Sequence, residues 1–170
     1  MDALKTAVAS VADLMDRQLE LVVDEKFNNG LTSNLIPPLE DDDPDSGLNH
    51  GFKGMQIACS SLTAEALNKC MPLTVFSRST ECHNQDKVSM GTTAARQARD
   101  VLRLAEKVAV IHLLALCQAA DLRGADLLGS TRSIYLRVRS IVPKLDRDRP
   151  MDNDISRLLE SLRAGELLDS

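Results

Sequence analysis

A short polar segment, Glu81-Cys82-His83-Asn84-Gln85-Asp86, holds the side chains best suited to chemistry in this sequence. It combines a carboxylate, an imidazole and two amides, groups that can bind a polar substrate and move protons. The segment precedes a predicted helix, whose free N–H groups and dipole favour anions and stabilise developing negative charge. It is therefore a candidate active-site loop.

These residues also have a structural interpretation. Asp86 and Ser89 can cap the following helix, while Asn84 and Gln85 can satisfy backbone groups of the loop. Polar residues before helices are common, and composition alone favours this alternative.

Two further chemistries receive little support. Cys82 beside His83 suggests a thiol nucleophile, but adjacent residues rarely form a productive pair and no orienting third group is recognisable. A metal site built from Cys82, His83 and a distant His50 or His112 has no supporting ligand spacing, so no metal is expected.

Hydrophobic periodicity predicts the helices that position this loop. Small residues are frequent in the second predicted helix, and they let neighbouring helices approach closely, so we expect that helix to be central. The prediction is one helical domain over 1–170, divided into a first helix 1–26, a loop 27–50, a central helix 51–70, an active-site-like loop 71–88, a long helix 89–123 and C-terminal helices 124–170.

The long helix contains a regular apolar seam. Its residues recur at intervals of 3, 4, 3 and 4, the spacing of helical bundles and coiled coils, and they are Val101, Leu104, Val108, Ile111 and Ala115. Long helices that are apolar on more than one side need more neighbours than this chain supplies. We therefore expect an elongated all-α bundle that is part of a larger oligomer.

Composition agrees with a helical globular chain. Of the 170 residues, 44% are hydrophobic and 26% charged, which argues against wholesale disorder. Aromatic residues are only 2%, and a core of Leu, Val, Ile and Ala favours helices over a β-sandwich. The net charge of -5 makes nucleic acid and anionic membranes poor partners.

No secretory signal pattern is present, and the four cysteines form no CxxC pair, so we expect reduced thiols and a cytoplasmic location.

The run His83-Asn84-Gln85-Asp86-Lys87-Val88-Ser89-Met90-Gly91 resembles the aromatic amino acid lyase family, which contains histidine, phenylalanine and tyrosine ammonia-lyases and 2,3-aminomutases. Asn29-Gly30-Leu31 with Leu35, and Gly47-Leu48-Asn49-His50-Gly51-Phe52, are similar to the family's segment before its central helix. Residues 94–123 are similar to the long helix that follows. The resemblance covers most of residues 1–145, in order, and matches only the C-terminal half of a lyase.

This resemblance implies a tetrameric helical-bundle core with active sites where several subunits meet. It also implies catalysis by a methylidene-imidazolone (MIO), an electrophile formed from an internal Ala-Ser-Gly. Carried over by position, Glu81 matches a catalytic carboxylate near the substrate amine. Asn84 and Gln85 match a pair that lines the pocket, and His83 is assigned to substrate binding with them. Histidine ammonia-lyases typically have Glu at the position of Gln85, so phenylalanine or tyrosine is the favoured substrate.

The sequence also departs from the family pattern. It contains no Ala-Ser-Gly and no Gln-x-x-Tyr-Ser-x-Arg, and its one tyrosine, Tyr135, lies well after the matched site and is given no catalytic role. We therefore expect the small subunit of a split ammonia-lyase or 2,3-aminomutase, inactive alone, whose large-subunit partner supplies the MIO group in a hetero-oligomer. The alternative is a non-catalytic helical interaction or regulatory module. Exposed apolar helix faces that need a partner would favour the split enzyme.

Overall fold

The computed structural model describes residues 1–40 and 42–167, with only the backbone described at Leu127. Over these residues the chain is helical and contains no strand, as predicted. Asp41, in the predicted loop 27–50, and residues 168–170, at the end of the predicted C-terminal segment, lie outside the described part. The α-helices are α1 (Asp2–Val23), α2 (Lys53–Asn68), α3 (Gly91–Arg123), α4 (Arg132–Ile141) and α5 (Asp152–Arg163), and the short 3-10 helices are η1 (Ser33–Leu35), η2 (Leu73–Phe76) and η3 (Ala125–Leu127).

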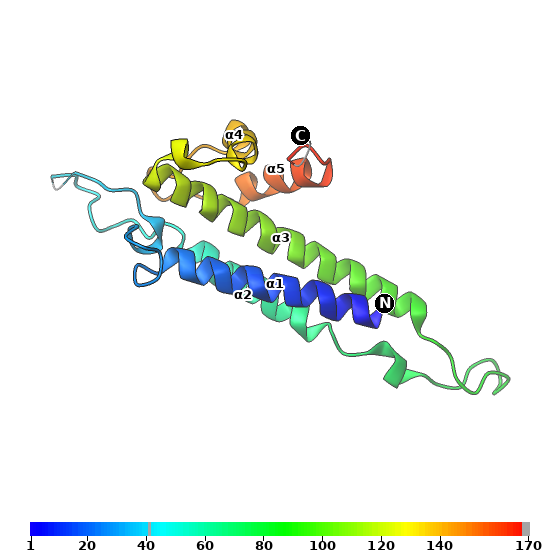
Figure 1. The fold of residues 1–170 in the computed structure, drawn as a ribbon. Coiled ribbons are helices and arrows are strands. Elements are labelled where there is room, and N and C mark those ends of the chain that lie inside the picture. The colour runs from blue at the N-terminus through cyan, green and yellow to red at the C-terminus, as the bar shows by residue number, and fades with distance from the viewer. Residues whose placement is uncertain (41, 168–170) are drawn as a thin grey trace.

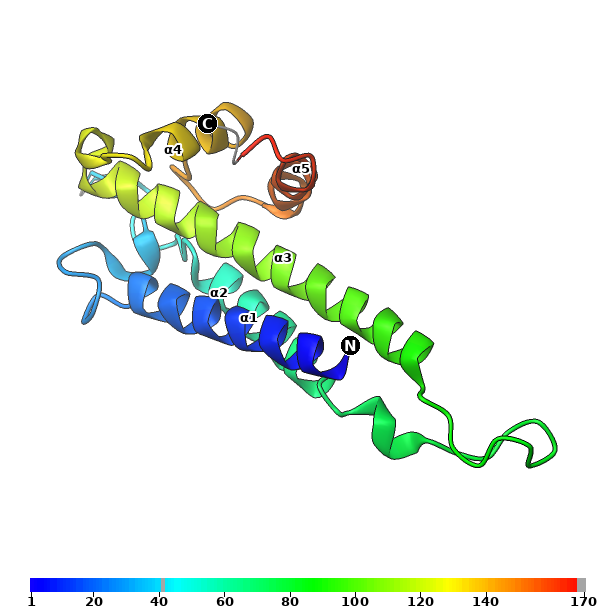
Figure 2. The same ribbon diagram turned by 45° about the vertical axis from the view of Figure 1, so that its right-hand side comes forward.

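Three long helices lie side by side and give the molecule its elongated shape (Figure 1). The chain runs along α1, returns along α2 and runs forward again along α3. The connection between α1 and α2 therefore lies at one end of the bundle, and the connection between α2 and α3 lies at the other. Helices α4 and α5 cover the C-terminal half of α3 on the side away from α1, as the turned view also shows (Figure 2).

Helix α3 is the central element, because it contacts α1, α2, α4 and α5. All five residues of its predicted seam are buried, and its second half is buried on further sides where α4 and α5 pack against it. The expectation that residues 51–70 form the central helix is not met within this chain. Small residues of α2 instead face outward, among them Gly54, Ala58, Ser61 and Ala64.

The end of the predicted active-site-like loop differs from expectation, because α3 starts later than predicted. This helix begins at Gly91, two residues later than expected, with Met90 as its N-cap residue in a left-handed conformation at φ 55°. The predicted cap, Ser89, accepts the Gly91 N–H through its hydroxyl oxygen at 3.3 Å. No helix among the described residues has the length and apolar character needed to cross a bilayer.

The connection between α1 and α2 is fixed by residues from the C-terminal part of the chain. The Arg147 guanidinium pairs with the carboxylates of Asp43, at 2.7 Å, and Asp45. The buried amide of Gln118 in α3 donates to the Leu145 carbonyl at 2.9 Å and accepts the Leu145 N–H at 3.0 Å. These bonds hold the connection between α4 and α5 against the connection between α1 and α2 and against the C-terminal part of α3.

Candidate functional site

The four sequence-predicted site residues lie together on a hairpin that projects beyond the end of the bundle (Figure 1). This hairpin, residues 77–90, leads from η2 into α3, and we call it the site loop. Glu81, His83, Asn84 and Gln85 are all exposed. The three-helix bundle thus presents them to the surroundings, and the part of the chain that the structure describes leaves all four side chains uncovered.

Hydrogen bonds across the site loop join its two arms. At the neck, the Ser77 hydroxyl donates to the Val88 carbonyl at 2.6 Å and accepts the Val88 N–H at 2.9 Å. Nearer the tip, Thr80 and Gln85 form an isolated antiparallel bridge with N–H···O distances of 2.9 and 3.3 Å. Between these residues, the Asn84 N–H donates to the Glu81 carbonyl at 2.9 Å, which closes a tight turn.

The tip of the site loop has a strained backbone. Glu81, Cys82 and His83 follow one another with positive φ angles of 56°, 52° and 67°. Left-handed conformations cost L-residues about 1–2 kcal/mol each, because Cβ approaches the following carbonyl oxygen. Consecutive residues of this kind are uncommon outside functional sites, and they persist only where surrounding bonds hold them.

The polar side chains at the tip contact one another. The Gln85 amide donates to a Glu81 carboxylate oxygen at 3.4 Å, and the Ser79 hydroxyl lies 3.1 Å from Nδ1 of His83. This arrangement leaves a carboxylate, an imidazole and two amides on one small surface, with hydrogen-bonding capacity free for a polar ligand. Of the structural alternative, only the Ser89 bond to the Gly91 N–H is present among the described residues, and no bond from the Asp86 side chain to α3 is observed there.

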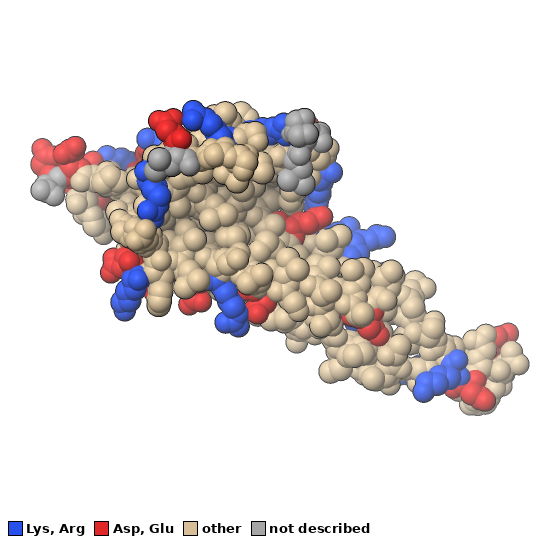
Figure 3. All heavy atoms as spheres, viewed as in Figure 1, with Lys and Arg blue, Asp and Glu red and all other residues tan. Residues whose placement is uncertain are grey.

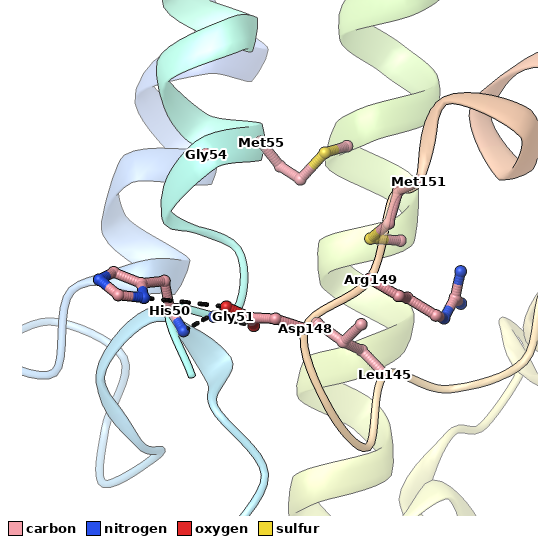
Figure 4. Close-up of a pocket in the computed structure, with 8 residues that line it drawn as sticks. All are labelled: His50, Gly51, Gly54, Met55, Leu145, Asp148, Arg149 and Met151. Atoms are coloured by element: carbon pink, nitrogen blue, oxygen red, sulfur yellow. Dashed lines mark hydrogen bonds and ion pairs between the residues drawn. The ribbon is translucent and has the colours of Figure 1, made fainter. Parts of the chain in front are cut away.

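The other groups considered from the sequence lie apart from the loop. His50 lies in the connection just before α2 (Figure 4), and His112 is half-buried within α3. Among the described residues, no three His, Cys, Asp or Glu side chains are placed to hold a metal ion. Tyr135 donates its hydroxyl to Asp121 at 2.5 Å, which connects α4 to α3. That bond raises the pKa of the Tyr135 phenol.

A pocket of about 430 Å³, which the sequence did not suggest, lies where α2 begins (Figure 4). Its polar lining includes His50, Arg149 and the Asp148 carboxylate, which accepts the backbone N–H groups of His50 at 2.7 Å and Gly51 at 2.8 Å. Met55, Leu145 and Met151 provide its apolar part. Asp148 lies 97 and 98 residues from its two partners, and no local pattern indicates such a contact. The carboxylate holds the turn before α2, so its role in the chain is structural.

Comparison with known proteins identifies the family. Residues 1–140 match the family model described as aromatic amino acid lyase. A histidine ammonia-lyase from Caenorhabditis elegans is 36% identical over 100% of this chain, and a tyrosine ammonia-lyase from Cupriavidus metallidurans is 36% identical over 99% of it. The crystal structure of a tyrosine aminomutase from Streptomyces globisporus has a TM-score of 0.90 and 34% identity over 99% of the chain. The chain therefore belongs to the aromatic amino acid lyase family.

The match covers only part of each relative. The chain spans 24% of the C. elegans ammonia-lyase, 31% of the C. metallidurans ammonia-lyase and 31% of the S. globisporus aminomutase chain. The similarity thus concerns about a quarter to a third of a complete lyase.

Proposed function

We propose that this chain supplies one wall of the substrate pocket of an aromatic amino acid ammonia-lyase or 2,3-aminomutase, as the small subunit of a split enzyme. The observation that carries this proposal is the site loop itself: its polar set is exposed at the end of the bundle, and the described residues of this chain leave it uncovered. A second polypeptide then closes the pocket and carries the groups that are missing here.

The residues present suit such a pocket. The chain contains no Ala-Ser-Gly, so the MIO group belongs to the partner. When bound there, the group supplies an electrophile for the substrate amine. A carboxylate at Glu81 is then able to hold the amine and to accept a proton from it. The amide groups of Asn84 and Gln85 donate and accept hydrogen bonds beside it without adding charge.

The substrate class follows from the same side chains. Gln85 is neutral, whereas an acidic residue at this position would suit an imidazole ring. A neutral aromatic side chain, that of phenylalanine or tyrosine, therefore fits this loop better than histidine. The products are ammonia with an arylacrylate for a lyase, or a β-amino acid for an aminomutase.

The first test is to purify this chain, tagged, from its own host and to identify by mass spectrometry what binds it. We expect a stoichiometric partner that carries Ala-Ser-Gly and is about two waters lighter than its sequence mass, because the resemblance implies loss of water both on cyclisation and on dehydration of the serine. A chain that is recovered alone as a stable homo-oligomer would instead support the non-catalytic helical module.

The second test measures ammonia and aromatic products in the reconstituted complex. We expect Glu81→Gln to lower kcat by about 10²-fold or more, the usual contribution of a positioned acid–base group. Gln85→Glu should shift substrate preference toward histidine. Glu160→Gln removes an exposed carboxylate on α5, and this matched control should leave turnover unchanged. Unchanged turnover and preference in both loop variants would rule out the proposed site.

A further inference from the structure

The side chain of Ser77 occupies the narrowest part of the site loop and bonds twice to one residue of the opposite arm. It donates to the carbonyl of Val88 at 2.6 Å and accepts its N–H at 2.9 Å. One hydroxyl thus forms the pair of bonds that two facing backbone groups form in an antiparallel sheet. Both residues are half-buried, whereas the residues between them, 78–87, are exposed.

Below the neck, the two arms are fixed by a separate contact with α1. The ammonium group of Lys5, which is fully buried, donates to the Met71 carbonyl at 2.8 Å and to the Gln97 side chain at 2.9 Å. Met71 precedes the site loop and Gln97 lies in the second turn of α3, so this contact fixes the base of both arms. It does not reach residues 77–88.

Above the neck, the tip needs support. Three consecutive left-handed residues favour relaxation of the turn. Because these residues are exposed, no packed neighbours among the described residues hold them in this conformation. Besides the Gln85–Glu81 and Ser79–His83 side-chain contacts at the tip, the described bonds that join the two arms are those of Ser77 with Val88 and of Thr80 with Gln85. Of the two pairs that join the arms, the Ser77–Val88 pair depends on a side chain, so a substitution can remove it.

We propose that Ser77 is a positioning residue: its hydroxyl closes the neck and thereby holds Glu81, Asn84 and Gln85 in one geometry. This role rests on the proposed function only for its effect on turnover. The closed neck itself is a property of this chain and can be measured without any partner.

Amide hydrogen exchange of the full chain, followed by NMR, tests the neck. In Ser77→Ala we expect the Val88 amide to exchange about tenfold faster or more, because two hydrogen bonds are lost. The Gln85 amide should also exchange faster. Ser77→Thr keeps the hydroxyl, so its Val88 exchange rate should stay within about twofold of the wild-type rate. This comparison separates the loss of the hydrogen bonds from other effects of changing the side chain. Ser140→Ala is the control, since this exposed α4 serine donates to the Arg137 carbonyl of its own helix, at 2.7 Å, and lies outside the site loop.

Activity of the reconstituted complex tests the consequence. We expect Ser77→Ala to lower kcat about tenfold, with a smaller change in KM and an unchanged melting temperature of the chain, and Ser77→Thr to restore kcat. Unchanged exchange at Val88 and Gln85 in Ser77→Ala would overturn the proposal whatever the activity. Faster exchange with full activity would overturn the positioning role. If the wild-type complex has no lyase or aminomutase activity, the proposed function fails, and the exchange rates still decide whether Ser77 closes the neck.

Discussion

Gly51 occupies a position where any larger residue would force the neighbouring backbone to move. Its φ angle is +54°, and a Cβ atom there would lie 2.4 Å from the backbone oxygen of Asn34. We expect Gly51→Ala to lower the free energy of unfolding by about 2–3 kcal/mol, because the backbone itself must move. Urea denaturation followed by circular dichroism measures this change.

The matched control is Gly54→Ala, three residues further along. Gly54 lies in the first turn of α2, where a methyl group would meet nothing within 4 Å, and alanine is the better helix former. This variant should gain up to about 1 kcal/mol. Equal losses in the two variants would contradict the steric explanation for Gly51.

The four cysteines are free thiols in different environments. Burial raises the pKa of Cys59 to about 12 and that of Cys117 to about 11, whereas Cys82 is exposed on the site loop. Because the thiolate is the nucleophile, we expect an aromatic disulfide reagent at pH 8 to label Cys82 at least about a hundredfold faster than the two buried thiols.

Stopped-flow absorbance measures these labelling rates. Cys82→Ser should remove the fastest phase and leave the slow ones. Rapid labelling of Cys59 or Cys117 in the folded chain would show that the core around them opens readily.

At the scale of elements, local patterns predicted the helices but not what holds their connections. The α3 seam could be predicted because Val101, Leu104 and Val108 repeat within one helix, where spacing alone determines which side is buried. The bonds of Asp148 to His50 and Gly51 could not, since they join residues almost a hundred positions apart.

For the site loop too, the sequence indicated which residues matter but not the contacts and backbone conformation that position them. Its residue types indicated chemistry and its resemblance indicated a family, so the four candidate residues could be named from the sequence. The left-handed conformations of Glu81, Cys82 and His83 left no signal, because none of these residues is glycine or asparagine. The role of Ser77 likewise depends on Val88, eleven residues away, across a turn that the sequence does not specify.

Lys5 connects three elements and should contribute more to stability than its place near the start of α1 suggests. Its ammonium contacts the Met71 carbonyl, the Gln97 side chain and, at 3.1 Å, the Asp2 carboxylate. Lys5→Met removes the buried ammonium that these three acceptors share, and we expect a loss of about 3 kcal/mol. Urea denaturation measures it. Lys107→Met removes an exposed lysine of α3 and should change stability by less than about 0.5 kcal/mol. Similar losses in both variants would contradict a stabilising role for the contacts of the Lys5 ammonium.

Helix α3 carries the group that makes stability depend on pH near neutrality. Burial lowers the pKa of His112 below its ordinary value. The unfolded chain therefore binds this proton at a higher pH than the folded chain does. The stability that depends on His112 being neutral is fully present above about pH 6.5 and is lost as pH falls through the lower, folded-state pKa.

Urea midpoints between pH 8 and pH 5 measure this effect. We expect the midpoint of the wild type to fall across this range and that of His112→Gln to stay flatter. The lowered pKa values of Asp2, Asp43 and Asp154 act in a separate window, below about pH 4. Parallel curves for wild type and variant would assign the slope to other groups.

For the whole molecule, the notable feature is that α1 is apolar on two sides. One side, including Ala9, Ala12 and Leu19, is buried inside the bundle. The other side carries an outer stripe of exposed residues spaced 7, 3 and 7 apart, namely Leu4, Val11, Leu14 and Leu21. The face that carries α1 has broad areas without charge (Figure 3). Spacing of this kind fits another helix packed along α1.

The proposed occupant of the outer stripe is the polypeptide that provides the rest of the lyase fold, since the relatives are three to four times longer than the part matched here. We expect Leu14→Glu, at a residue that is 56% exposed, to reduce self-association of the isolated chain and to weaken binding of the partner about tenfold or more. Lys26→Glu, in the exposed turn after α1, adds negative charge away from the stripe and should bind normally. Analytical ultracentrifugation measures self-association, and titration with the partner measures affinity. If Leu14→Glu binds the partner as tightly as the wild type, the outer stripe is not the interface, and the partner must reach the site loop along another face of the bundle.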